Sequence, residues 1–216
     1  MELIAHRGLT YKHLENSKEA IMAALEDKTT AGVEFDVRIT YDKKFVVIHD
    51  INAMRHFNDR RLISEVPLSE LRKLDYKGYK ISTLEEVLES IETDKIILVE
   101  MKVDFEPEDY VVRINKILKK YKHLNFYVGS FKSAAVKHLK KINKDLKVGI
   151  LRGIGMDGIP SYVDFVSLNY YADFSKEYLK QVAKSTELFL WTVNKCIEKI
   201  DARIITNDPH KLVKCK

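Results

Sequence analysis

The sequence predicts an α/β protein built as a (β/α)8 TIM barrel, and three observations indicate this class. Short apolar, β-branched segments alternate with longer segments whose apolar residues recur at helical spacing. The alternation runs through all 216 residues, a length at the short end of the range for such barrels. No linker, repeat or low-complexity segment divides the chain, so we expect one domain over residues 1–216. An open doubly wound sheet is the alternative.

Nine segments are expected to form strands. They are residues 3–6, 32–40, 45–49, 95–102, 125–130, 146–151, 163–168, 188–193 and 203–206. Residues 40–44 alone join the second segment to the third, which leaves no room for a crossover helix, so these two are expected to form an antiparallel β-hairpin. Eight parallel strands then remain for the barrel, with the hairpin after the second strand.

Helices are expected between most of these strands. Ser82 and Glu85 stand at the start of an apolar stripe with helical spacing, and we expect them to form a capping box. Other helix starts are indicated at Pro107, Ser175 and Asn207-Asp208-Pro209.

The composition is that of an ordinary globular protein, with 45% hydrophobic and 32% charged residues and a net charge of +5. No apolar run approaches the roughly 18 residues of a membrane span. The first residues lack the basic and apolar regions of a signal peptide, so we expect a cytoplasmic protein. The two cysteines, Cys196 and Cys215, exclude a disulfide framework and fit no zinc spacing, and we assign them no chemistry.

Basic residues are concentrated in residues 113–147, where one Arg and ten Lys stand against a single acid, Asp145. Two solvated helix faces are the favoured interpretation. Attraction to an anionic surface such as lipid headgroups is the alternative. Nucleic acid is disfavoured because the segment lacks aromatic residues arranged as a stacking platform.

Three carboxylates are expected to meet at the mouth of the barrel. Glu34 and Asp36 are two apart on one strand and point to the same face, and Glu100 ends the next barrel strand. At about 5 Å, each pair of like charges costs roughly 3 kcal/mol at an effective dielectric constant near 20. Because all three ligands are oxygens, a hard divalent cation, Mg2+ or Ca2+, fits best.

The same strand ends carry two histidines, His6 and His49, and two cations, Arg7 and Lys102. Arg and Lys bind phosphate oxygens, and a pair of histidines can act as general acid and base. Together with a metal, these residues indicate phosphoryl chemistry.

At this point the chain resembles the glycerophosphodiester phosphodiesterase family, whose fold is a (β/α)8 barrel related to phosphatidylinositol-specific phospholipase C. The resemblance rests on motifs that follow in family order, namely Ala5-His6-Arg7-Gly8, Glu15-Asn16-Ser17, Val33-Glu34-Phe35-Asp36-Val37, Val46-Val47-Ile48-His49-Asp50, Glu100-Met101-Lys102, Gly129-Ser130-Phe131, Leu190-Trp191-Thr192-Val193-Asn194 and Ile204-Ile205-Thr206-Asn207-Asp208-Pro209. Each fragment is weak alone, but the ordered set spans about 200 residues.

The resemblance implies hydrolysis of a glycerophosphodiester to glycerol 3-phosphate and an alcohol, with attack by the glycerol 2-hydroxyl and a cyclic phosphate that water opens. It also implies a role for each site residue: His6 and His49 as the acid/base pair, Glu34, Asp36 and Glu100 as ligands of one Mg2+ or Ca2+ ion, and Arg7, Lys102 and Trp191 as substrate contacts. Trp191 fits a core position equally well. Glu15 is a further candidate ligand, although a helix-start carboxylate is equally plausible.

Departures from the family pattern leave the headgroup open. Leu14 and Ser82 replace family prolines, and the segment 51–80, which shapes the pocket in relatives, is short. The expected partner is a small glycerophosphodiester and not nucleic acid, with a weak contact to an anionic membrane surface through residues 113–147. The alternatives are a phospholipase-D-like enzyme acting on lysophospholipids at a membrane, or a barrel that binds phosphodiesters without turnover.

Overall fold

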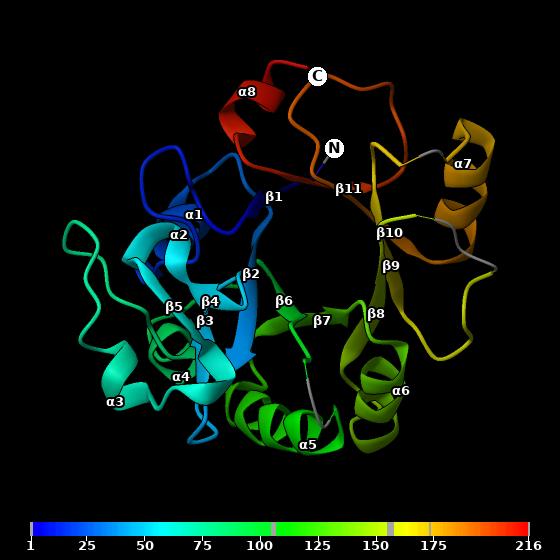
Figure 1. Ribbon diagram of the computed structural model, residues 1–216. Coiled ribbons are helices and arrows are strands. Elements are labelled where there is room, and N and C mark those ends of the chain that lie inside the picture. Colours follow the sequence, from blue (N-terminus) through cyan, green and yellow to red (C-terminus); the bar gives the residue numbers. More distant parts are fainter. Residues whose placement is uncertain (1, 105–106, 155–157, 173, 216) are drawn as a thin grey trace.

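Eight parallel strands close into a barrel in the computed structural model, which describes residues 2–104, 107–154, 158–172 and 174–215 (Figure 1). Around the barrel they are β1 (Leu3–His6), β2 (Gly32–Ile39), β6 (Ile96–Met101), β7 (Asn125–Ser130), β8 (Lys147–Arg152), β9 (Phe165–Asn169), β10 (Glu187–Trp191) and β11 (Arg203–Thr206). The barrel closes because β1 pairs with both β11 and β2. The fold class expected from the sequence is confirmed.

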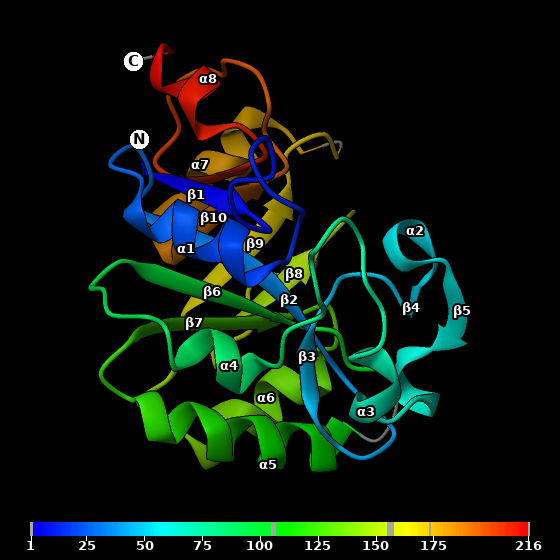
Figure 2. The same cartoon turned by 90° about the vertical axis from the view of Figure 1, so that its left-hand side faces the viewer.

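The expected hairpin is also confirmed, because β3 (Phe45–Val47) pairs antiparallel with the end of β2. Beyond it lies a segment whose structure the sequence did not reveal, with a small sheet beside the barrel (Figure 2). Its elements are β4 (Asn52–Ala53), α2 (Met54–Phe57), β5 (Asp59–Leu62), the 3-10 helix η1 (Ile63–Glu65) and α3 (Leu68–Leu71).

Helices surround much of the barrel, and Figure 1 shows them outside the strands. They are α1 (Lys18–Glu26), α4 (Leu84–Leu88), α5 (Pro107–Leu118) with the 3-10 helix η2 (Lys119–Tyr121), α6 (Ser133–Ile142), α7 (Lys176–Ser185) and α8 (Pro209–Val213). Helix starts are confirmed at Pro107, at Ser175, whose hydroxyl caps α7, and at Asp208, whose carboxylate caps α8.

The capping box of α4 was placed one residue too early. Thr83 accepts a hydrogen bond from the backbone N–H of Glu86, and Glu86 accepts one from that of Thr83. Ser82 cannot begin the helix because its carbonyl accepts a hydrogen bond from Val47, which ties it to β3.

The connection between β10 and β11 is short and is linked to the C-terminal helix by a disulfide. Residues 192–202, between β10 and β11, carry no helix, and Cys196 forms a disulfide with Cys215 just after α8, with a Cα–Cα distance of 5.4 Å. The bridge therefore ties the exposed connection to the C-terminal helix. This corrects the expectation that the two cysteines have no chemistry.

Side chains fill the interior of the barrel at the N-terminal ends of its strands. An apolar layer packs there, formed by Ile4, Ile96, Leu98, Tyr127, Phe165, Phe189 and Ile205. Below it, the Tyr127 hydroxyl bonds with Glu187, which also pairs with Lys147 and Arg203. The apolar layer and the polar groups around Glu187 together form a plug that closes the N-terminal end of the barrel. The C-terminal end stays available for a functional site. No helix among the described residues is long and apolar enough to cross a membrane.

Candidate active site

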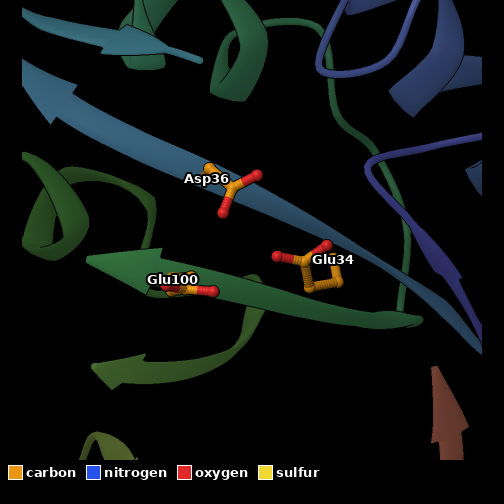
Figure 3. A group of neighbouring side chains, drawn as sticks. All are labelled: Glu34, Asp36 and Glu100. Atoms are coloured by element: carbon orange, nitrogen blue, oxygen red, sulfur yellow. The ribbon is translucent and has the colours of Figure 1, made fainter. Parts of the chain in front are cut away.

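The three expected carboxylates meet inside the open end of the barrel. Glu34 and Asp36 lie on β2, and Glu100 lies on the neighbouring strand β6 (Figure 3). Glu34 is in register with Leu98 of the interior layer and Asp36 with Glu100, so alternation points all three side chains inward. They are 4%, 1% and 8% exposed, and one oxygen from each lies within 4.8 Å of the others.

The pKa values of these three carboxyl groups reflect the close approach of their negative charges. Burial, followed by repulsion from Asp36 and Glu100, raises the pKa of Glu34 well above its usual value. Burial and Asp36 raise the pKa of Glu100 to about 7. Burial also acts to raise the pKa of Asp36, but Lys102 and Arg7 outweigh it and lower that pKa. Because a bound cation would relieve this repulsion, the donor set fits a hard divalent ion.

Two cationic side chains flank the cluster. The Lys102 ammonium lies 3.1 Å from Oδ1 of Asp36 and also contacts Glu100. The backbone N–H of Arg7 donates to Oε2 of Glu34 at 3.0 Å, and its Nε lies 3.4 Å from Oδ2 of Asp36. Arg7 and Lys102 therefore stand where the sequence expected the phosphate contacts.

The turn after β1 places Arg7 against the cluster. Arg7 has a φ of 58° and Gly8 a φ of +88°, and a Cβ on Gly8 would lie 2.5 Å from the backbone carbon of Ala20. Asn16 completes the turn, since its amide donates to Oδ2 of Asp36 at 2.8 Å and its oxygen accepts from the Asp36 N–H at 3.0 Å. No pattern in the sequence predicts this contact of Asn16.

Each histidine is held by a hydrogen bond at Nδ1. His6 bonds with Oδ1 of Asn207 at 2.6 Å, and His49 with Oδ1 of Asp50 at 2.8 Å. Burial and the nearby Arg7 lower the pKa of His6 to about 4, and burial also lowers the pKa of His49. Asn207 lies two residues beyond the inward-facing Ile205, and this alternation is the signal in the sequence that indicates its position at the site.

Glu15 is occupied elsewhere. Its oxygens bond with Arg7 at 2.9 Å and with Arg55 at 2.6 and 2.9 Å. Arg55 also donates to Asp50 at 2.7 Å, and Asp50 in turn holds His49. Glu15 and Arg55 thus link the two sides of the site, and Glu15 lies outside the carboxylate cluster.

A cavity of about 140 Å³ opens beside these groups. It brings together seven of the eight residues predicted for the site, with Asp36 buried behind them: His6, Arg7, Glu34, His49, Glu100, Lys102 and Trp191. Trp191 packs edge-on against Phe131 at 5.9 Å between ring centroids, so it lines the cavity and also closes the apolar layer.

Comparison with known proteins agrees with this arrangement. The sequence matches the glycerophosphoryl diester phosphodiesterase family over residues 6–206. A glycerophosphodiester phosphodiesterase of Caldanaerobacter subterraneus is 31% identical over 234 residues, which cover 98% of this chain and 96% of that protein.

Solved structures share the fold. A glycerophosphodiester phosphodiesterase from Thermotoga maritima matches with a TM-score of 0.80 and 30% identity, over 99% of this chain and 97% of that one. A phosphodiesterase from Oleispira antarctica, solved with the product sn-glycerol-3-phosphate, matches with a TM-score of 0.86 and 22% identity, over 100% and 96%.

Proposed function

This chain belongs to the glycerophosphoryl diester phosphodiesterase family and hydrolyses glycerophosphodiesters, and from that premise we propose a mechanism with one divalent cation and two histidines. The observation that carries the proposal is the cluster of three buried carboxylates beside two histidines and two cations in one cavity. The products are glycerol 3-phosphate and an alcohol. Residues 1–216 act as one domain in this proposal.

Glu34, Asp36 and Glu100 would hold a single Mg2+ or Ca2+ ion, because both prefer oxygen ligands. When bound, the ion would stabilise the negative charge that develops on the phosphoryl oxygens. Arg7 and Lys102 bind the same phosphate from the side of the cluster, the first as a fork and the second as a point charge.

The histidines divide the proton transfers. A hydrogen bond from Nδ1 of His6 to the Asn207 oxygen leaves Nε2 without a proton, which suits a general base. The Asp50 carboxylate accepts a hydrogen bond from Nδ1 of His49 and would stabilise the imidazolium while His49 carries the proton, although burial outweighs this effect and lowers the pKa of the imidazole. We therefore assign His6 as the base and His49 as the acid of the first step.

In that step the 2-hydroxyl oxygen of glycerol bonds to phosphorus and gives its proton to His6. The bond from phosphorus to the headgroup oxygen breaks as His49 protonates the leaving alcohol. Water then attacks the cyclic phosphate with the two roles reversed, so that His49 accepts a proton and His6 returns one to the 2-hydroxyl. Trp191 packs against the glycerol.

Residues 113–147 are proposed to make at most a weak contact with an anionic surface. α5 and α6 run back from the cavity end of the strands, so their lysine-rich C-terminal ends lie at the opposite end of the barrel (Figure 2). A membrane bound there would not face the cavity. This favours a soluble diester over a lysophospholipid as the substrate.

We propose a cytoplasmic location, and the disulfide is the observation that argues against it. Disulfides persist mainly in oxidising compartments. Trapping Cys196 and Cys215 with an alkylating reagent at lysis distinguishes the two settings: free thiols agree with the cytoplasm, and a preserved bridge refutes it.

The function is tested by incubating the purified protein with glycerophosphocholine and glycerophosphoethanolamine, with Mg2+ or Ca2+ supplied. We expect release of glycerol 3-phosphate, its loss with EDTA, and recovery when the cation is restored. Failure on a panel of headgroups with the metal present would refute the function, and activity that EDTA does not reduce would refute the metal.

A further inference from the structure

The cavity has a polar group that the mechanism does not use. Apart from the charged and polar groups of the site, the wall of the cavity is formed mostly by apolar side chains, those of Leu98, Phe131, Leu151, Trp191 and Ile205. Ser167 on β9 lies in this wall, 1% exposed. It points inward because it is two residues beyond Phe165 of the interior layer.

The Ser167 hydroxyl has no hydrogen-bond partner among the described residues. This is unusual for a buried hydroxyl, because an unpaired polar group in an apolar site is destabilising. Ser130, also 1% exposed and at the end of β7, bonds with Met101 at 2.8 Å and with Lys132 at 3.2 Å. The barrel therefore pairs the hydroxyl of Ser130 and leaves that of Ser167, in the wall of the cavity, without a partner among the described residues.

A second unpaired donor belongs to a residue of the same wall. Nε1 of Trp191 is buried without a partner, and Trp191 lies in register with Asn169, two residues beyond Ser167 on the adjacent strand. Two unsatisfied polar groups on neighbouring strands around one cavity indicate a ligand with hydroxyl groups rather than an apolar chain.

The cavity is large enough for that ligand, because a volume of about 140 Å³ accommodates a three-carbon polyol. With the phosphate at Arg7 and Lys102, the glycerol 2-hydroxyl must stay near phosphorus to attack it. The hydroxyl that can reach the opposite wall is then the terminal one.

We propose that Ser167 binds the free terminal hydroxyl of the glycerol unit and is the residue by which this chain recognises that hydroxyl. The proposal rests on the function proposed above and adds a specificity residue to it. A substrate acylated at that oxygen cannot donate to Ser167, and its chain would have to enter a wall closed by Leu151 and Ile205. Lysophospholipids are therefore poor substrates.

The test compares two substrates that differ by one hydroxyl: glycerophosphoethanolamine and the corresponding phosphoethanolamine diester of propane-1,2-diol, which lacks the terminal hydroxyl. We expect the wild-type kcat/KM to favour the first by roughly tenfold to a hundredfold. Ser167→Ala should lower kcat/KM for the first substrate only and so abolish the preference. Ser130→Ala, the matched control, should keep it.

Three outcomes overturn the proposal: equal kcat/KM for the two substrates in the wild type, a preference that survives in Ser167→Ala, or lysophosphatidylethanolamine turned over as fast as glycerophosphoethanolamine. The wild-type comparison stands even where a variant does not fold. If the wild type turns over neither substrate, the proposed function fails separately. Calorimetric binding of glycerol 3-phosphate against propane-1,2-diol phosphate then tests Ser167 by itself, and equal affinities refute its role.

Discussion

Replacing Glu34 with Gln removes a charge from the carboxylate cluster with little change of shape. Burial and the neighbouring carboxylates raise the pKa of Glu34, so the charged form of this group is already disfavoured in the metal-free protein. Its bond from the Arg7 N–H, at 3.0 Å, can be kept by the amide oxygen. Glu34→Gln should therefore fold as stably as the wild type without metal and lose its response to metal.

The magnitude follows from the spacing of the ligands. At 4.8 Å and an effective dielectric constant of about 20, two unit charges interact by roughly 3.5 kcal/mol, so the loss of one carboxylate is expected to weaken cation binding at least ~100-fold. At a concentration 100 times its Kd, the cation stabilises the wild type by about 2.7 kcal/mol. For a chain of 216 residues this raises Tm by roughly 5–11 °C, whereas the variant should gain about 1 °C.

Thermal unfolding with Mg2+, Ca2+ or EDTA measures this difference. Glu15→Gln is the matched control, because Glu15 lies at the same mouth but is bound by Arg7 and Arg55. We expect the control to keep the full rise in Tm. A full rise in Glu34→Gln, or its loss in Glu15→Gln, would show that the ligand set is wrong.

The pH dependence of the metal-free protein gives the same argument an independent readout. Glu34 and Glu100 have raised pKa values, about 7 for Glu100, so the folded chain holds protons that the unfolded chain releases above about pH 4.5. Their contribution to stability is therefore present below pH 4.5 and lost as the pH rises towards 7. A bound cation should remove this loss, and Glu34→Gln should reduce it.

Three further predictions concern other parts of the molecule. His6→Ala and His49→Ala should each lower kcat for glycerol 3-phosphate release by about 10²–10⁴-fold while the rise in Tm with metal persists, and full activity in both would exclude the acid/base assignment. Reducing the Cys196–Cys215 disulfide, whose cysteines are 19 residues apart, should lower the free energy of unfolding by about 3 kcal/mol in denaturant titrations, against no change if the bridge is not formed in solution. Tyr127→Phe should cost about 1–2 kcal/mol of stability by breaking the plug and leave kcat/KM unchanged; a fall in kcat/KM would contradict the separation of the two barrel ends.

The fold was predictable because strands and helices here carry strong periodic signals. All nine expected strands form, with bounds within two residues, since each is a short apolar run between polar turns. The exceptions are local. The capping box moved from Ser82 to Thr83 because a backbone bond to Val47 decides where α4 begins, and no pattern within the helix reports that contact.

The carboxylate cluster was also predictable, because strand geometry decides which side chains share a face. Side chains two apart on a strand share a face, and the carboxyl ends of parallel strands share one rim, so Glu34, Asp36 and Glu100 could be placed together before any coordinates. The residues that hold them were not. Asn16 and Asn207 act across 20 and 201 positions of sequence, and an amide carries no charge pattern that singles it out.

The connection 192–202 illustrates how such distant support can matter. Oδ1 of Asn194 accepts from the Asn207 N–H at 2.9 Å, and Asn207 in turn holds His6. Cys196 lies two residues beyond Asn194, so the disulfide fixes a helix-free loop next to the residue that orients a catalytic histidine. A barrel shell usually supplies that rigidity with a helix. In this chain the covalent bridge to Cys215 contributes such rigidity, because it ties a connection without a helix to the end of α8.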